Sequence, residues 1–229
     1  MNTLKDKATF KQAFIDTLPV MSGYLIMGAG FGMVMNSYGY PPYLSTLMAV
    51  CIYAGAMQYV GANLLFTGVS LFSVALTTFI VNARHIFYGL TMLEQYKKAG
   101  KEKPYLYFGL TDETYTLLSR PLSVKNKRAY RFYVTILNHS YWIAGCTLGA
   151  LLGSAFPQVR GADFALTALF VVALVQSLEF HKRNDLPALI GAGATLLSLL
   201  IFGKDNFLLP AMGVIVALLL LLPEKEAKA

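Results

Sequence analysis

The chain begins with a short polar segment and then stays apolar for a long stretch. Residues 1–16 carry several charges, but the 67 residues from Thr17 to Ala83 contain no Asp, Glu, Lys or Arg. A membrane-crossing helix needs about 20 mostly apolar residues, so this block holds roughly three such lengths. Polar breaks at residues 36–42 and at Thr67-Gly68 divide it. The pattern predicts a chain that crosses a membrane several times.

Four more apolar stretches follow the basic segment 94–131, at residues 132–153, 161–178, 186–202 and 206–222. Backbone polar groups inside lipid must be satisfied within each segment, so these stretches are predicted to be helices, the last three in compact hairpins. The predicted fold is an all-α polytopic membrane protein. It forms a single transmembrane domain over residues 1–229, with six or seven crossings.

Composition and motifs narrow the function classes. Apolar residues make up 56% of the chain and charged residues 14%, against roughly 25% charged in soluble domains. Despite a net charge of +7, this excludes a soluble enzyme or a nucleic-acid-binding module, and membrane lipid is the expected surrounding. The chain has no phosphate loop, nucleophile elbow or metalloprotease motif, and Cys51 and Cys146 show no metal spacing. We expect no enzymatic activity, cofactor or metal.

The distribution of Lys and Arg predicts the orientation. Basic residues accumulate in short cytoplasmic loops, and nine of them lie in the segment 94–131. Counting the predicted spans onward places thirteen basic residues on that side and two on the other. We therefore expect residues 94–131 to form a basic cytoplasmic loop and the C-terminus to be cytoplasmic.

The N-terminus conflicts with a simple count of spans. Lys5, Lys7 and Lys11 also favour the cytoplasm, which requires an even number of crossings where three lengths are present. Either one helix is broken or re-entrant, or the chain crosses seven times with its N-terminus outside. Because glycine and proline weaken a helix, the glycine-rich run after Pro19 favours a break near Gly28–Gly32.

The three glycines Gly28, Gly30 and Gly32 have two interpretations. The spacing of Gly28 and Gly32 is that of a close helix–helix contact. Alternatively, the segment is unwound and its free backbone groups bind substrate. A second glycine ladder, at positions 145, 149 and 153, has no polar neighbours and predicts packing.

Polar side chains inside apolar spans are the other candidates. Arg84 lies about 13 Å from the end of its span; such a charge usually faces the bundle interior and marks function, unless it snorkels to the surface. Asn82 and His85 flank it. Gln58 and Asn63 either bridge helices or bind the charged groups of a substrate.

Two acidic residues and a histidine complete the set. Thr111 followed by Asp112 and Glu113 is typical of a capped helix start. A carboxylate here could also pair with Arg84 or carry a proton. His139 either relays a proton or bonds a neighbouring helix.

Four motifs spread along nearly the whole chain carry a family resemblance. They are Leu18-Pro19 with Gly23-Tyr24 and Gly28-x-Gly30-Phe31-Gly32; Ala54-Gly55-Ala56-x-Gln58-Tyr59; Thr77-Thr78-x-x-Val81-Asn82-x-Arg84-His85-x-x-Tyr88-Gly89; and Leu110-Thr111-Asp112-Glu113. The chain resembles the AzlC family, the large subunit of branched-chain amino-acid exporters of bacteria and archaea. The resemblance implies an exporter in the cytoplasmic membrane of a prokaryote that works with a small AzlD-like membrane subunit.

The combined hypothesis is a secondary transporter that binds a zwitterionic amino acid near the middle of the membrane. One methylene is worth only about 1–3 kcal/mol, so Leu, Ile, Val and Met should compete. The predicted substrate-binding residues are Gly28, Gly30, Gly32, Gln58, Asn63, Asn82 and Arg84. With no nucleotide motif, uphill export needs an ion gradient, and the candidates for proton coupling are His85, Asp112, Glu113 and His139. The alternatives are an assembly or sensory subunit that does not transport, and a passive channel.

Overall fold

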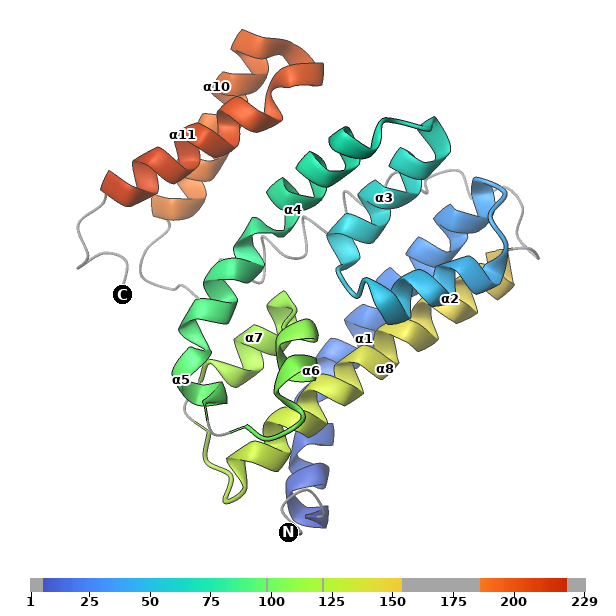
Figure 1. The fold of residues 1–229 in the computed structure, drawn as a ribbon, viewed down its shortest axis with the longest axis vertical. Coiled ribbons are helices and arrows are strands. Elements are labelled where there is room, and N and C mark those ends of the chain that lie inside the picture. The colour runs from blue at the N-terminus through green and yellow to red at the C-terminus, as the bar shows by residue number, and fades with distance from the viewer. Residues whose placement is uncertain (1–5, 98, 121, 154–185, 222–229) are drawn as a thin grey trace. The chain divides into compact units, whose positions relative to one another are not determined.

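The computed structural model of the protein describes residues 6–97, 99–120, 122–153 and 186–221, and within these ranges the regular elements are all helices. Two compact units, Met1–Leu169 and Phe170–Ala229, divide the chain and are considered separately (Figure 1). The span predicted at residues 161–178 lies outside the described ranges. The all-helical prediction is confirmed for the residues described.

Two long helices, α1 (Lys7–Ser37) and α8 (Lys127–Gly153), pack along each other in the first unit (Figure 1). At 1.5 Å per residue they are about 46 and 40 Å long, more than the roughly 30 Å of a bilayer core. The Thr17 hydroxyl lies 3.3 Å from that of Tyr141, and Asn36 donates to the Ala150 carbonyl at 3.4 Å. Because the contacts advance together along both helices, α1 and α8 run in the same direction.

The glycines of α1 lie inside an unbroken helix, so the break predicted at Gly28–Gly32 is wrong. Both Gly28 and Gly32 are buried and face α8. A methyl group added at Gly32 would lie 2.3 Å from the Ala150 nitrogen, and one added at Gly149 would lie 2.1 Å from the Ala29 carbonyl oxygen. The packing interpretation of both glycine ladders is confirmed, because close backbone approach requires glycine at these positions.

The helix break lies further along, between α2 (Pro42–Cys51) and α3 (Gly55–Thr67). With 10 and 13 residues, these helices are about 15 and 20 Å long, and each alone is too short to cross a membrane. The linking residue Tyr53 has φ 46°, a left-handed conformation that is rare for a bulky side chain. A break is therefore present, but in the second apolar stretch and not in the first.

Helices α2 and α3 form a hairpin beside α1 and α8. Along α2, Ser45 donates to the Cys146 carbonyl at 3.2 Å, while the Ala49 carbonyl lies 3.2 Å from Nε2 of His139. Helix α2 thus runs back along α8 to its middle. Helix α3 then returns, because Phe66 in its last turn stacks on Tyr38 just after α1, with ring centroids 4.5 Å apart.

After Gly68, whose φ is 64°, the chain enters α4 (Leu71–Thr91). Ser70 caps this helix by accepting from the Ser73 N–H. Among the described helices, α1 and α4 are those that are both long and apolar enough to cross a membrane. In contrast to α1, α4 contains no buried residue.

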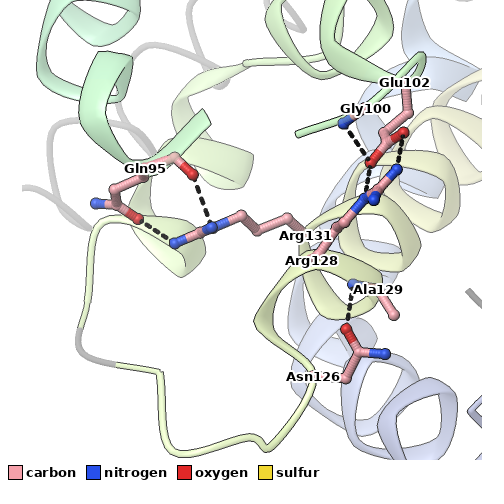
Figure 2. Close-up of polar contacts among 7 residues, drawn as sticks. All are labelled: Gln95, Gly100, Glu102, Asn126, Arg128, Ala129 and Arg131. Atoms are coloured by element: carbon pink, nitrogen blue, oxygen red, sulfur yellow. Dashed lines mark hydrogen bonds and ion pairs between the residues drawn. The ribbon is translucent and has the colours of Figure 1, made fainter. Parts of the chain in front are cut away.

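The segment expected to be a basic loop folds into α5 (Leu93–Tyr96), α6 (Lys103–Phe108) and α7 (Asp112–Leu118). Figure 2 shows how side chains at the start of α8 hold this segment. Arg128 donates to both carboxylate oxygens of Glu102, and Arg131 donates to the backbone carbonyl of Gln95 at 2.8 Å. These contacts hold the segment along α8, so the acidic motif that follows lies beside the middle of α8.

In the second unit, α10 (Leu186–Asn206) and α11 (Leu208–Leu221) pack against each other. Gly203, with φ 71° and ψ 173°, interrupts the helical geometry near the end of α10. Both helices lie where the apolar stretches 186–202 and 206–222 predict them. The predicted hairpin at this end of the chain is confirmed.

Candidate functional site

Two interruptions of the helices meet beside the middle of α1 and α8. The first is the α2–α3 break at Tyr53, and the second is the link Gly109–Thr111 between α6 and α7. A methyl group at Gly109 would lie 3.6 Å from the Tyr53 ring and 2.3 Å from the Thr135 side chain. We call this region the junction; it comprises Tyr24, Tyr53, Gln58, Thr111, Glu113, Thr114, Asn138, His139 and Trp142.

Gln58 gives the junction an open hydrogen-bond donor. Its side chain is fully buried, and its Oε1 accepts from Nε1 of Trp142 at 2.8 Å. An indole nitrogen can only donate, so the amide oxygen must face Trp142. The Nε2 group has no partner among the described residues. A buried donor without a partner costs about 1–3 kcal/mol, which a ligand could offset.

Asn138 and Tyr53 supply hydrogen-bond acceptors to the junction. The fully buried Asn138 donates through Nδ2 to Oγ1 of Thr114 at 3.0 Å, and its Oδ1 has no partner in the described part of the chain. The same holds for the buried hydroxyl of Tyr53. Helix α3 also begins without a side-chain cap, so its first N–H groups and the positive end of its dipole face the break. The junction thus combines unpartnered donors and acceptors.

Tyr53 is held in its strained conformation by its neighbours. Its ring stacks on His139, with centroids 4.2 Å apart, and lies 6.5 Å from the ring of Tyr24. Left-handed backbone at a residue other than glycine costs about 1–3 kcal/mol and persists where the surroundings enforce it, often at ligand sites. This strain marks the break as a functional candidate.

His139 has both ring nitrogens occupied. Nε2 lies 3.2 Å from the Ala49 carbonyl, and Nδ1 lies 2.9 Å from the Tyr105 hydroxyl. A carbonyl only accepts, so Nε2 carries the hydrogen and Tyr105 donates to Nδ1. These contacts favour the interpretation in which His139 bonds neighbouring segments.

Arg84 forms an ion pair with Asp112, which is one of the alternatives that the sequence offers for this acidic motif. Nη1 of Arg84 lies 2.7 Å from Oδ2 of Asp112, and the two side chains are 38% and 31% exposed. Beside the pair, Tyr88 stacks on Tyr115 with centroids 4.4 Å apart and planes 10° from parallel. Thr111 caps α7 as expected, accepting from the Thr114 N–H. These contacts join α4 to α7 at the edge of the junction.

Comparison with known proteins identifies the family. The sequence model described as AzlC protein matches residues 19–156, which include both helix breaks and the ion pair. The chain belongs to the AzlC family. No solved structure matches it.

Relatives of this AzlC-family chain are membrane and transport proteins. It is 38% identical over 226 residues to the branched-chain amino acid transport protein AzlC of Bacillus subtilis, covering 97% of this chain and 88% of the relative. It is 33% identical over 207 residues to the inner membrane protein YgaZ of Escherichia coli, covering 84% of each. A membrane protein of Helicobacter pylori strain J99 is 38% identical over 215 residues, which are 93% of this chain and 94% of the relative. The chain is therefore a membrane protein related to transporters.

Several residues predicted for the AzlC-family site lie apart from the junction. Asn63 is exposed and donates to the Tyr38 hydroxyl at 3.4 Å, near the far end of α3. His85 contacts the Asn82 carbonyl of its own helix at 3.2 Å. Gly28, Gly30 and Gly32 belong to the continuous α1. Of the predicted substrate-binding residues, Gln58 lies in the junction.

The sequence interpretation did not select several junction residues. Tyr24, Tyr53, Thr114, Asn138 and Trp142 come from four different parts of the fold. Asn138 carried a usable signal, because it precedes His139 inside an apolar span. Among the described residues, no group of three His, Cys, Asp or Glu side chains could hold a metal ion.

Proposed function

We propose that this chain is the large subunit of a secondary transporter that exports branched-chain amino acids across the cytoplasmic membrane, in exchange for protons and together with a small AzlD-like subunit. The name of the Bacillus subtilis relative, a branched-chain amino acid transport protein, supports the substrate class. The observation that carries the proposal is the junction, where unpartnered donors and acceptors lie beside the middle of two long helices. Interrupted helices at the membrane midplane are typical substrate sites of secondary transporters.

A zwitterionic amino acid matches the unpartnered groups. Nε2 of Gln58 and the first N–H groups of α3 would hold the carboxylate. Oδ1 of Asn138 and the hydroxyl of Tyr53 would accept from the ammonium group. The ring faces of Tyr24 and Trp142, whose centroids are 5.4 Å apart, offer apolar surface to an aliphatic side chain. Such a surface distinguishes Leu, Ile, Val and Met only weakly.

In this proposal Arg84 does not bind the substrate carboxylate and has a different role. Its guanidinium already holds Asp112, and both residues lie between α4 and the α6–α7 link. We infer that the pair closes the cytoplasmic entrance and separates when α4 moves. Asn82, two residues earlier on α4, has a buried Oδ1 without a described partner and would contact substrate when the pair opens.

The proposed topology has six crossings with both termini in the cytoplasm. It rests on the shared direction of α1 and α8, from which we infer that the basic residues before α1 and the basic segment 94–131 face the same side. A re-entrant hairpin of α2 and α3 then accounts for the even number of crossings between them. This arrangement satisfies the positive-inside rule for both of these basic regions.

Uptake of labelled L-leucine into inside-out vesicles tests the function. The vesicles contain this chain with or without its AzlD-like subunit. Accumulation that requires both subunits and collapses with a protonophore is the expected result. Equilibration that does not respond to the proton gradient would indicate a channel. No movement of Leu, Ile, Val or Met, in vesicles shown to contain both subunits, would contradict transport and favour an assembly or sensory role.

A further inference from the structure

Arg131, at the end of the basic segment 94–131, is a partly buried cation that forms no ion pair within the described residues. Its Nη1 and Nη2 groups donate to the backbone carbonyl and the side-chain oxygen of Gln95, at 2.8 and 3.0 Å (Figure 2). Both of these acceptors are neutral. Burial lowers the pKa of the Arg131 guanidinium, as expected for a cation that has lost water without gaining a counter-charge.

The acidic residues of the surrounding segment are all engaged elsewhere. Residues 94–131 contain four of them. They contact other partners: Glu94 lies beside Lys97, Glu102 beside Arg128, Asp112 beside Arg84, and Glu113 beside Tyr24. Because a charge removed from water is costly unless it is compensated, the positive charge of Arg131 calls for an anion from outside this segment.

Two buried tyrosine hydroxyls near Arg131 also lack partners. Tyr96 follows Gln95 in α5 and is fully buried, and its ring centroid lies 5.1 Å from that of Tyr107 on α6. The Tyr96 hydroxyl, the Tyr107 hydroxyl and Nε of Arg131 are all buried without a hydrogen-bond partner among the described residues. Arg131 and Tyr107 are also the ionisable groups whose charges act on Tyr96. We call these three groups the donor cluster.

The chemistry of the donor cluster favours an anion over a water molecule. Nε of arginine can only donate, and each tyrosine hydroxyl has a hydrogen to donate. A single water molecule would not accept from all three groups, and it would bring no charge to balance the guanidinium. Tyr96 belongs to a buried cluster that also contains Met92, Leu106 and Val134, and such apolar surroundings strengthen the attraction between opposite charges. Since all three donor atoms are buried, a compact ion fits better than a bulky oxyanion.

We propose that the donor cluster binds a chloride ion, which links α5 and α6 to the start of α8. The ion supplies the counter-charge of Arg131 and accepts the three unpartnered hydrogens. It braces the same segment that the pair of Glu102 and Arg128 holds to α8. The inference goes beyond the proposed transport function and does not depend on it, because chloride binding is measured on the purified protein in the absence of any transported substrate.

Thermal unfolding of the purified full chain in detergent tests the site. Sodium chloride is exchanged for sodium gluconate at constant ionic strength, since gluconate is too large for a buried site. Tyr96→Phe and Tyr107→Phe each remove one hydroxyl of the donor cluster and keep the ring, and Arg131→Gln removes the charge. The matched control is Tyr43→Phe, because Tyr43 is 72% exposed and lies outside the cluster. The two tyrosine variants decide the matter if Arg131→Gln does not fold.

In wild type and Tyr43→Phe, Tm should rise by about 3–6 °C for each tenfold increase in chloride above its dissociation constant. In Tyr96→Phe, Tyr107→Phe and Arg131→Gln this rise should be lost. In gluconate, the Tm of Tyr96→Phe should equal or exceed that of wild type, because the variant removes a buried hydroxyl that has no partner there. In chloride, its Tm should fall below that of wild type.

Three results would overturn the inference. The first is a wild-type Tm that does not respond to chloride. The second is a chloride response of the same size in Tyr96→Phe and Tyr107→Phe as in wild type, which would indicate a general effect of salt. The third is stabilisation of wild type by phosphate and not by chloride, which would indicate a different anion.

Discussion

Close packing of α1 on α8 makes Gly149→Ala a sharp test of the structure. The added methyl group would lie 2.1 Å from the Ala29 carbonyl oxygen, 2.4 Å from its Cα and 2.6 Å from its carbonyl carbon, whereas ordinary contacts are 3.4–4 Å. All three atoms belong to the backbone, so no side chain can turn away. The helices must separate locally by about 1 Å or more, and we place the overpacking at about 3 kcal/mol, the upper end of the usual range.

The control is Gly89→Ala on α4, where nothing described lies within 4 Å of the added methyl group. Alanine favours a helix over glycine by about 1 kcal/mol, which offsets part of the penalty at Gly149 and is the whole effect at Gly89. The net change is about 2 kcal/mol of destabilisation for Gly149→Ala. At about 2–4 °C per kcal/mol for a chain of this size, Tm should fall by about 4–8 °C in Gly149→Ala and rise by about 2–4 °C in Gly89→Ala.

Thermal unfolding of the purified protein in detergent, followed by loss of the monodisperse peak in size-exclusion chromatography, measures both variants. A Tm for Gly149→Ala at or above that of wild type would refute the close approach of α1 and α8. In that case close packing would not explain the two glycine ladders.

Three further predictions concern the site and the segment that carries it. Arg84→Ala should abolish leucine export from vesicles that still contain the protein, whereas exchanging the two charges (Arg84→Asp with Asp112→Arg) should restore part of it; normal export by Arg84→Ala would show that the ion pair is dispensable. Gln58→Glu keeps an acceptor for Trp142 but replaces the free donor with an oxygen that repels a carboxylate. It should raise the leucine concentration for half-maximal transport at least about tenfold, and an unchanged value would exclude Gln58 from the substrate site. Arg128 holds the pKa of Glu102 at about 2, below its usual 4.5, so the ion pair stabilises the fold above about pH 4.5 and this stabilisation is lost as pH falls towards 2. The Tm of Glu102→Gln should therefore lie below that of wild type at pH 7, and the difference should shrink below pH 4.5; a constant difference would contradict this origin.

Apolar patterning was sufficient to predict the long helices, but not the position of the break or the short helices α5, α6 and α7 in the segment expected to be a basic loop. Uncharged stretches bounded by Gly68 and by Pro41-Pro42 define where helices end, and these boundaries appear in the structure. The glycines of α1 were misinterpreted because glycine weakens an isolated helix and also permits close packing. Which effect prevails depends on the matching glycines of α8, more than a hundred residues away in sequence. Tyr53, where the break occurs, is a residue type that carries no signal for left-handed backbone.

The ion pair was among the alternatives that the sequence offered, because a charge inside an apolar span requires a partner, whereas the junction was not predictable. Arg84 inside an apolar span restricts its partner to the few acidic residues available, and Asp112 was among them. Gln58 was predicted to bind substrate, and Asn138 carried a signal beside His139, but nothing in the sequence shows that they lie together with Trp142. Their common location depends on how two chain segments turn back along α8, and that course follows from tertiary packing.

The pairing of α1 with α8 has a consequence for how the protein is made. Gly28 faces Cys146, so the ribosome must add about 120 residues after the glycine face of α1 has been synthesised. At roughly 5–20 residues per second, this face waits for about 6–24 seconds in the insertion machinery or in lipid before its partner emerges. During that interval α2, α3 and α4 arrive first. The nascent chain must therefore keep α1 available, and any factor that shields its glycines from premature contacts would raise the yield of folded transporter.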